Sequence, residues 1–273
     1  KRIQEVFNLE PSIKNDPVDD KSNDEVSIEF DHVTFVYPDG EEPVLYDVSF
    51  KAKKGEVVAF IGSTGSGKST LVNLIPRFYD VSKGRIKINE KDIRDYDVLQ
   101  LRDKLGVIPQ KAVLFSGSIA DNIRFGKKDA TDEEVIHAAK VAQAYSFIMD
   151  KENGFNELIS EGATNVSGGQ KQRLSIARAL VRKAQIYIFD DSFSALDYKT
   201  DATLRRRLKE VTQDATVLIV AQRVGTIMDA DQIIVLDKGE IVGRGRHEEL
   251  MESNEIYREI ANSQFNQKSL TED

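Results

Sequence analysis

Apolar and polar residues alternate along the first part of the chain. The alternation runs through residues 27–30 and 33–37, breaks at 38–40, and resumes over 44–52. This period of two is typical of strands with one buried face, and Pro, Asp and Gly at 38–40 are typical turn residues. We therefore expect an antiparallel sheet near the N-terminus.

Three later segments are continuously apolar, namely residues 56–61, 186–189 and 216–220. Such runs predict strands that are buried on both faces. Helical patterns separate them, and the Thr131–Glu134 segment has the form of a capping box. Buried strands that alternate with helices indicate a parallel α/β core. The expected helices cover residues 69–77, 131–142, 167–182 and 197–212.

Together, these patterns predict a single α/β domain over residues 26–265. Its middle block, residues 111–170, has no strong strand pattern and is expected to be a helical insertion. Residues 232–244 predict a late hairpin. Residues 1–25 are polar and predict a short helical tail followed by a linker, and residues 266–273 predict a disordered polar tail.

Composition narrows the functional classes. Of the 273 residues, 40% are hydrophobic and 31% charged, which suits a packed globular core. The net charge of −8 argues against a non-specific nucleic-acid binder, which needs a basic face. The absence of cysteine excludes disulfides and thiolate chemistry, and it fits a reducing compartment. No apolar run approaches the roughly 20 residues of a membrane span.

The strongest motif is a phosphate-binding loop that follows the first continuously apolar strand. The sequence at 62–69 matches G-x-x-x-x-G-K-[ST] in full and opens a predicted helix. Glycines let backbone N–H groups approach phosphate oxygens, and the helix N-terminus favours the same anion. By itself the motif indicates a nucleoside triphosphate without specifying the enzyme. The predicted ATP-binding residues here are Gly62, Ser63, Thr64, Gly65, Ser66, Gly67, Lys68, Ser69 and Thr70.

A second buried strand, which ends in two acidic residues, completes the expected site. The apolar run 186–189 ends in Asp190 and Asp191, at the sheet edge where the phosphate loop should also lie. We expect Asp190 and the Ser69 hydroxyl to hold Mg²⁺. The alternative for Asp190 is a loop aspartate that caps the following segment.

One segment narrows the class to a family. Val166-Ser167-Gly168-Gly169-Gln170 precedes a helix and resembles the ABC signature sequence, with Val166 in place of the usual Leu. Three further elements resemble the same family: Tyr37 stands where an aromatic ring stacks on adenine, Gln110 resembles the Q-loop glutamine that reaches Mg²⁺, and the segment ending in Asp197 resembles the D-loop. The resemblance covers roughly residues 26–265. It implies a P-loop NTPase (RecA-like) core with an N-terminal antiparallel β subdomain and an inserted helical subdomain.

Several segments resemble the exporter branch of the ABC family. They are residues 94–96, 101–102, 114–119 and 121–123, together with Ser160-Glu161-Gly162, which resembles the exporter X-loop. Residues 1–3 resemble the end of a last transmembrane helix. The resemblance implies an upstream transmembrane domain, an integral membrane protein, and a position for this segment at the cytoplasmic face of the membrane.

The sequence departs from the family pattern at the two positions closest to the γ-phosphate. The family places Glu after the magnesium aspartate, whereas this chain has Asp191. The missing methylene retracts the carboxylate by about 1.5 Å, and a misplacement near 1 Å costs on the order of 100-fold in rate. The family's switch histidine is replaced by Gln222, which cannot become cationic. Asp191 could still serve as a slower base, and Gln222 could be a tolerated variation.

The resemblance implies head-to-tail pairing of two ABC domains. We expect a heterodimer in which this chain's own site binds ATP and Mg²⁺ but hydrolyses ATP weakly. Its signature, Ser167 to Gln170, would complete the competent site of the partner subunit. Three alternatives stay open: an importer ATPase, a soluble ABC protein that clamps nucleic acid, and a regulatory nucleotide-binding module without turnover.

Overall fold

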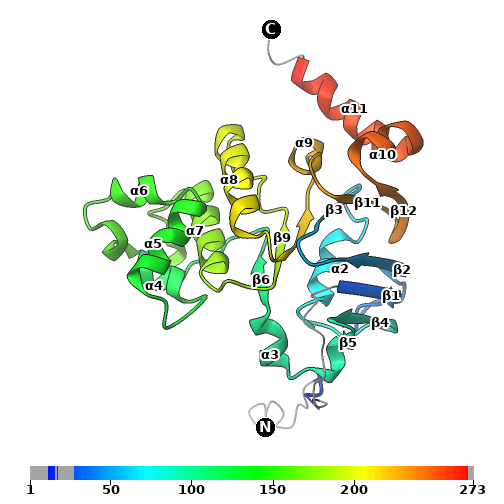
Figure 1. Cartoon of the computed structure of the whole chain (residues 1–273), viewed down its shortest axis with the longest axis horizontal. Coiled ribbons are helices and arrows are strands. Elements are labelled where there is room, and N and C mark those ends of the chain that lie inside the picture. Colours follow the sequence, from blue (N-terminus) through cyan, green and yellow to red (C-terminus); the bar gives the residue numbers. More distant parts are fainter. Residues whose placement is uncertain (1–11, 16, 18–27, 270–273) are drawn as a thin grey trace.

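A computed structural model describes residues 12–15, 17 and 28–269 of the chain. Most of the predicted N-terminal helical tail and linker, residues 1–25, lies outside the described residues. The described part contains two large sheets and a helical region beside them (Figure 1). Among these residues, no helix combines the length and the apolar character that crossing a membrane requires.

The first sheet is antiparallel, as predicted. Its strands are β1 (Ile28–Phe35), β2 (Leu45–Ala52), β4 (Lys83–Ile88) and β5 (Lys91–Asp92), in the order β2-β1-β4-β5. The two strands expected at 27–37 form one strand, because a bulge between Phe30 and Val33 shifts the register without ending the pairing. His32 lies in that bulge with a left-handed φ of 52°.

The second sheet has six strands and carries the continuously apolar runs. All neighbours pair in parallel except β11 and β12, which form the predicted hairpin. The strand order is β12-β11-β3-β10-β9-β6. The strands are β3 (Val57–Ile61), β6 (Leu105–Ile108), β9 (Ile186–Asp190), β10 (Thr216–Val220), β11 (Gln232–Asp237) and β12 (Glu240–Gly245).

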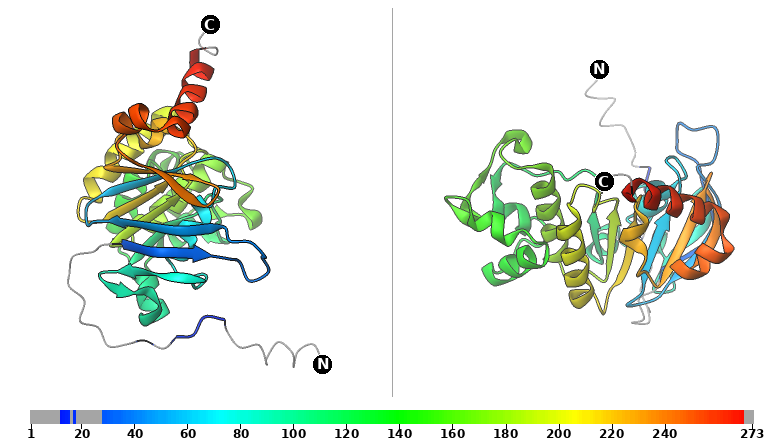
Figure 2. Two further views of the ribbon diagram at one scale, coloured as in Figure 1. Left: turned by 90° about the vertical axis from the view of Figure 1, so that its right-hand side faces the viewer. Right: turned by 90° about the horizontal axis from the view of Figure 1, so that it is seen from above.

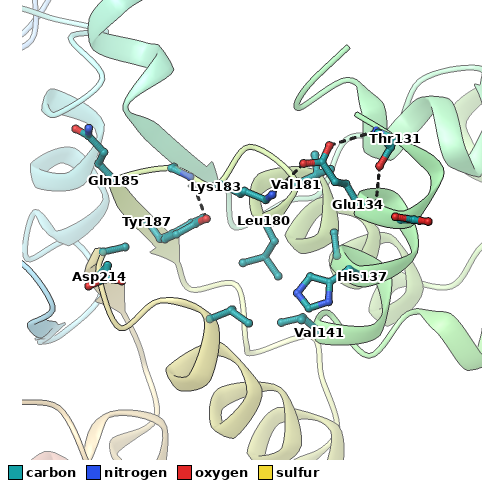
Figure 3. Close-up of a pocket in the computed structure, with 15 residues that line it drawn as sticks. Thr131, Glu134, His137, Val141, Leu180, Val181, Lys183, Gln185, Tyr187 and Asp214 are labelled. Atoms are coloured by element: carbon teal, nitrogen blue, oxygen red, sulfur yellow. Dashed lines mark hydrogen bonds and ion pairs between the residues drawn. The ribbon is translucent and has the colours of Figure 1, made fainter. Parts of the chain in front are cut away.

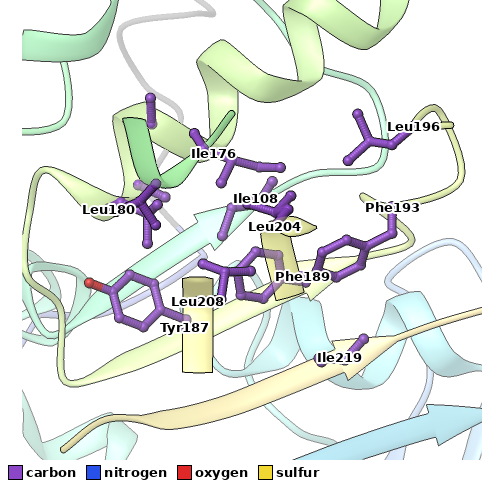
Figure 4. Packing of buried hydrophobic residues seen from close by; sticks show 14 of the residues in the cluster. Ile108, Ile176, Leu180, Tyr187, Phe189, Phe193, Leu196, Leu204, Leu208 and Ile219 are labelled. Atoms are coloured by element: carbon purple, nitrogen blue, oxygen red, sulfur yellow. The ribbon is translucent and has the colours of Figure 1, made fainter. Parts of the chain in front are cut away.

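Two hydrophobic cores cover the two faces of this sheet. One fills the space between the two sheets, where α2 (Lys68–Leu74) buries Leu71, Val72 and Leu74. The other lies on the opposite face beneath α7 (Gly168–Leu180) and α8 (Tyr198–Val211). There the rings of Phe189 and Phe193 stack with centroids 5.1 Å apart (Figure 4). Two views at right angles show the layers (Figure 2).

The middle of the chain contains several short helices, and it also holds a two-stranded sheet, formed by residues 117–118 and 158–159, that the sequence did not predict. The capping box predicted at Thr131 is present, with Glu134 as its partner. Helix α7 packs against α4 and α5, so the helical region in Figure 1 continues to the end of α7 and beyond residue 170. The elements are β7 (Gly117–Ser118), α4 (Ile119–Arg124), α5 (Asp132–Val141), α6 (Tyr145–Met149), a 3₁₀ turn at Gly154–Asn156, β8 (Leu158–Ile159) and a 3₁₀ turn at Glu161–Ala163.

The C-terminal end differs from the expectation. Helix α11 (Glu255–Ser269) continues past residue 266, where a disordered tail was predicted. The predicted tail was inferred from polarity alone, but a helix can extend beyond its buried residues because its backbone hydrogen bonds are internal. The remaining helices are a 3₁₀ turn at Ile93–Asp95, α3 (Val98–Asp103), α9 (Val224–Ile227) and α10 (His247–Ser253).

Candidate nucleotide site

The phosphate loop joins the end of β3 to the start of α2. Gly65 and Gly67 have left-handed φ values of 82° and 96°, which favour glycine. A Cβ on Gly62 would lie 2.0 Å from the carbonyl oxygen of Leu236, so only glycine fits there. The loop therefore curls tightly ahead of the N-terminus of α2, where backbone N–H groups favour an anion.

Lys68 is held inside this loop by acceptors that the loop itself supplies. Its Nζ donates to the carbonyl oxygens of Gly62 (2.8 Å) and Ser63 (2.7 Å) and to Ser66 Oγ (3.1 Å). Burial lowers the pKa of the Lys68 ammonium, and the nearby carboxylates oppose that shift. The ammonium is thus held by oxygen atoms of the loop itself.

Ser69 and Asp190 meet at the predicted magnesium position. Ser69 Oγ donates to Asp190 Oδ1 at 2.9 Å. Asp190 is only 8% exposed, and burial raises the pKa of its carboxyl group. The described residues contain no cluster of three or more acidic or histidine side chains that could cage a metal. One hydroxyl and one carboxylate fit Mg²⁺, which keeps several waters and takes phosphate oxygens as its other ligands.

Asp191 lies between two glutamine side chains. Its Oδ2 accepts a hydrogen bond from Gln222 Nε2 at 2.7 Å and one from Gln110 Nε2 at 3.1 Å. Strand order explains the meeting, because β9 lies between β6, which precedes Gln110, and β10, which precedes Gln222. Burial raises the pKa of the Asp191 carboxyl, and hydrogen bonds from Gln110, Ser194 and the Gln222 backbone oppose the rise. Its backbone has a left-handed φ of 46°.

Gln110 therefore lies beside Asp191, and its amide nitrogen donates to that carboxylate. The sequence predicted Gln110 as a magnesium ligand, a role that would fall to the amide oxygen Oε1. The start of its loop is fixed to the helical region, because Gln172 Nε2 on α7 donates to the carbonyl oxygen of Pro109 at 3.1 Å. This link joins the loop of Gln110 to the helix that follows the signature.

Tyr37 is attached to the same helix as Lys68. Its hydroxyl lies 2.9 Å from Thr70 Oγ1, in the first turn of α2. The ring makes edge contacts with Phe35 at 4.8 Å and with Tyr79 at 5.2 Å between centroids. Tyr37 and Thr70 thus both border the phosphate loop.

The signature lies apart from these residues. Ser167 caps α7: its Oγ accepts from the Gln170 backbone N–H, and Gln170 Oε1 accepts from the Ser167 N–H. Figure 1 places α7 beside α4 and α5, with β6 and β9 between α7 and α2. A Cβ on Gly168 would meet no atom within 4 Å, whereas one on Gly169 would lie 3.3 Å from the Ala195 carbonyl oxygen.

Asp197 also lies outside the cluster and caps α8. Its carboxylate accepts from the Thr200 backbone N–H at 2.9 Å and from the Thr200 hydroxyl at 2.7 Å. These hydrogen bonds lower the pKa of Asp197. The structure thus brings the phosphate loop, Asp190, Asp191, Gln110 and Gln222 together and leaves the signature and Asp197 at other surfaces.

Two serines support the acidic turn, and one of them, Ser194, begins the segment that resembles the D-loop. Ser192 is fully buried, and its Oγ donates to the carbonyl oxygen of Ile108 at 2.9 Å. Ser194 Oγ donates to the backbone oxygen of Asp191 at 2.8 Å. The sequence did not single out Ser192, whose only signal is its position directly after Asp191, where a short hydroxyl side chain can bond to nearby backbone.

A cavity of about 590 Å³ lies elsewhere, between α5 and the start of β9 (Figure 3). His137, Leu180 and Tyr187 are among its lining residues, and none belongs to the phosphate loop. Tyr187 accepts a hydrogen bond on its hydroxyl from the Ala184 N–H at 3.0 Å. Cavity size alone therefore does not locate the nucleotide site, which is an open, polar loop.

Comparison with known proteins agrees with this geometry. The sequence profile described as ABC transporter matches residues 45–194, which is more than half of the chain. The chain belongs to the ABC transporter family. The match includes the phosphate loop, the signature and the acidic turn of this ABC domain. Its α/β fold is accordingly that of an ABC ATPase domain, consistent with a P-loop NTPase.

Individual relatives agree with the family assignment. The ABC domain is 47% identical over 238 residues to the uncharacterized ABC transporter ATP-binding protein YfiB of Bacillus subtilis (strain 168), covering 87% of the chain and 41% of YfiB. It is 42% identical over 258 residues to a putative multidrug export ATP-binding/permease protein of Staphylococcus aureus (strain NCTC 8325 / PS 47), covering 94% of the chain and 44% of that protein.

A solved structure is also similar. The structure of a bacterial Atm1-family ABC exporter with ATP bound superimposes with a TM-score of 0.90 at 35% identity, over 95% of this chain and 46% of that one. The ABC domain thus spans less than half the length of the relatives it matches, and it is related to ABC exporters. Its ABC transporter ATP-binding homologues imply ATPase activity.

Proposed function

We propose that this chain is the ATP-binding domain of an ABC exporter and couples ATP binding and hydrolysis to export across a membrane. Mg²⁺·ATP would bind at Gly62–Thr70, with Ser69, Asp190 and Gln110 around the metal and Tyr37 stacked on the adenine. The relatives support the exporter assignment, since one is named as a putative multidrug exporter and another as an Atm1-family exporter. Net negative charge argues against the nucleic-acid alternative.

The chain's own ATP site is proposed to be degenerate. The observation that carries this proposal is the Asp191 carboxylate, which accepts hydrogen bonds on one oxygen from two neutral amides, Gln110 and Gln222. A water at the γ-phosphate needs a base that reaches it, and Asp191 is one methylene shorter than the family's glutamate. Gln222 can donate a hydrogen bond to a phosphate but cannot take up or release a proton.

We further propose a head-to-tail heterodimer. The signature residues Ser167 to Gln170 would complete the competent site of the partner subunit, and the partner's signature would close over this chain's phosphate loop. The separation of the signature from the phosphate loop within one chain supports this arrangement (Figure 1). The slow site would hold the dimer partly closed while the other turns over, a shift in population between two states.

The proposed organisation follows the exporter resemblance. Residues 1–25 would lead from an upstream transmembrane domain into the ABC domain at 26–265, on the cytoplasmic face of the membrane. The helical block at about 111–170, extended through α7, would carry the contacts with the membrane part. A regulatory module without turnover remains the second candidate, because the same Asp191 contacts would also suit a site that only binds ATP.

The test is Asp191→Ala in the assembled transporter. The proposal expects steady-state ATPase activity to stay within about twofold of the parent, because the competent site uses the partner's catalytic residues. The matched control removes the acidic residue at the equivalent position of the partner subunit, which should abolish turnover. Near-complete loss of activity with Asp191→Ala would contradict the degenerate site.

A further inference from the structure

The C-terminal helix α11 carries a side chain that binds the loop of Gln222. Gln264 Nε2 donates to the carbonyl oxygen of Gln222 at 2.7 Å, and Gln264 Oε1 accepts from the backbone N–H of Val224 at 2.8 Å. The two ends of one side-chain amide therefore hold backbone groups on both sides of Arg223. This contact joins the last helix of the chain to the loop that carries a residue of the candidate site.

The position of Gln264 is fixed by the packing of α11. Tyr257, Ala261 and Gln264 are spaced i, i+4 and i+7, so they lie on one face of the helix. Tyr257 and Ala261 are fully buried in the same core as Val224 of α9, and α11 packs against α9 (Figure 1). The Tyr257 hydroxyl also lies 2.7 Å from His247 Nδ1. Because a helix is rigid over two turns, these contacts set the place from which Gln264 reaches the loop.

The residue that precedes α9 cannot cap this helix itself. Helix α9 begins at Val224, and the side chain of Arg223 has only donors, so it cannot accept the first N–H of the helix. The guanidinium of Arg223 instead donates to the Ser194 carbonyl oxygen at 3.5 Å. Gln264 Oε1 thus supplies, from another helix, the acceptor that a side chain at the N-cap commonly supplies.

The loop that Gln264 holds also delivers Gln222 to the acidic turn. Gln222 lies two residues after the end of β10, and its Nε2 donates to Asp191 Oδ2 at 2.7 Å. The side chain and the carbonyl group of Gln222 are therefore bound by two different elements, the acidic turn and α11. A displaced Gln222 backbone would carry the side-chain amide away from Asp191, because hydrogen bonds weaken steeply as their geometry departs from the ideal.

We propose that Gln264 is a positioning residue of the nucleotide site. It holds the loop at 222–224 so that the Gln222 side chain meets Asp191 and, when ATP is bound, the γ-phosphate. The contact with the γ-phosphate rests on the proposed function, whereas the contact with Asp191 does not. Helix α11 thereby belongs to the nucleotide site, although the sequence placed Gln264 at the polar end of the domain.

Two variants test the positioning in the nucleotide-free 273-residue chain. Gln264→Met keeps the side-chain length and removes both hydrogen bonds, whereas Gln264→Glu keeps the acceptor for the Val224 N–H and removes the donor to the Gln222 carbonyl oxygen. Both should shift the NMR resonance of the Gln222 side-chain amide, which is assigned by its absence in Gln222→Met. Only Gln264→Met should speed hydrogen exchange of the Val224 N–H, by about 2- to 12-fold. An unshifted Gln222 amide in both variants would overturn the proposal.

Matched controls distinguish this contact from a general loosening of α11. Asn262→Met and Asn262→Glu make the same chemical changes at an exposed position of the same helix, two residues away. Tyr257→Phe removes the hydroxyl contact with His247 and leaves Gln264 in place. All three controls should leave the Gln222 side-chain amide unshifted. The same shift in any of them as in Gln264→Met would show that every weakening of α11 moves the loop, and it would refute a specific role of Gln264.

Nucleotide binding supplies a readout that a purely structural role of Gln264 would not change. Calorimetry compares Mg²⁺·ATP with Mg²⁺·ADP, which lacks the γ-phosphate that Gln222 would contact. Gln264→Met should weaken ATP binding about 2- to 12-fold, as the loss of one hydrogen bond predicts, and leave ADP binding unchanged. An equal loss for both nucleotides, or no loss for either, would overturn the role at the γ-phosphate. If the parent chain binds neither nucleotide, the proposed function fails, and the Gln222 resonance still decides whether Gln264 positions the loop.

Discussion

The side-chain amide of Gln222 donates a 2.7 Å hydrogen bond to Asp191 Oδ2. The same oxygen accepts from Gln110 at 3.1 Å, so one carboxylate oxygen joins the ends of three neighbouring strands. Both donors are neutral amides, which can orient the carboxylate but cannot exchange a proton with it.

Replacing Asp190 with Asn should stabilise the nucleotide-free protein at neutral pH. Burial raises the pKa of Asp190, so the folded state binds more protons than the unfolded state between the ordinary and the raised pKa. Stability is therefore lost as pH rises through that window. The variant should raise Tm by about 2–4 °C at pH 7.5, equivalent to about 1 kcal/mol.

The same variant has a pH signature. Its advantage should shrink as the pH falls through the raised pKa of Asp190, because the parent carboxyl takes up a proton there, and thermal unfolding as a function of pH measures it. Asn keeps an acceptor for the Ser69 hydroxyl, so loss of that hydrogen bond does not contribute to the measured change in Tm. A lower Tm for Asp190→Asn at neutral pH would contradict the raised pKa.

Lys68→Ala should weaken binding of Mg²⁺·ATP by about 10- to 150-fold. The ammonium is held in the loop by three acceptors, and a charge-assisted hydrogen bond to phosphate contributes about 1.5–3 kcal/mol. Lys54→Ala is the control, because Lys54 is exposed on a turn away from the loop. Calorimetry measures ATP binding by both variants, and equal affinities would show that the loop is not part of the nucleotide site.

Two variants of Tyr37 distinguish the contribution of ring stacking to ATP binding from that of its hydroxyl hydrogen bond. Tyr37→Ala should weaken ATP binding by about 5- to 150-fold, in line with the roughly 1–3 kcal/mol of base–aromatic stacking. Tyr37→Phe removes only the 2.9 Å contact with Thr70 and should stay within about threefold of the parent. If the Phe variant binds as weakly as the Ala variant, the hydroxyl contact holds the loop and the ring does not stack on adenine.

Gly168→Ala should reduce the ATPase activity of the assembled transporter without destabilising the isolated chain. A Cβ at this helical position meets no atom within 4 Å, and alanine favours a helix over glycine by about 1 kcal/mol, so the isolated chain should unfold at the same or a higher temperature. In the assembled transporter the added methyl would face the partner's nucleotide and reduce ATPase activity at least tenfold. Unchanged activity there would contradict the proposed role of the signature.

The residues of the site that are close in sequence could be predicted without a structure. Lys68 and Ser69 follow a buried strand after the six-residue loop 62–67, and Asp190 ends another strand, so the local pattern was enough to expect them at one sheet edge. Both large sheets and the hairpin after Gln232 were predicted for the same reason, since burial on one or two faces leaves a regular imprint on the sequence.

The contact of Gln110 with Asp191 could not be predicted, because it depends on strand order. Strand β6, which delivers Gln110, has four residues and includes Gly106, so its pattern is weak. Gly106 is needed there because a Cβ would lie 2.6 Å from the Tyr187 ring. Strand β4 was missed because only Ile86 and Ile88 are buried among lysine, arginine and glycine.

The central claim, that Asp191 and Gln222 limit this chain's own catalysis, is tested by restoring the family's residues. The measurement is the steady-state ATPase rate of the assembled transporter whose partner subunit lacks its own catalytic acidic residue, compared with and without Asp191→Glu and Gln222→His in this chain, at saturating Mg²⁺·ATP. The account predicts that kcat rises at least tenfold while ATP affinity changes little. An unchanged or lower kcat in a folded double variant that still binds ATP would contradict it.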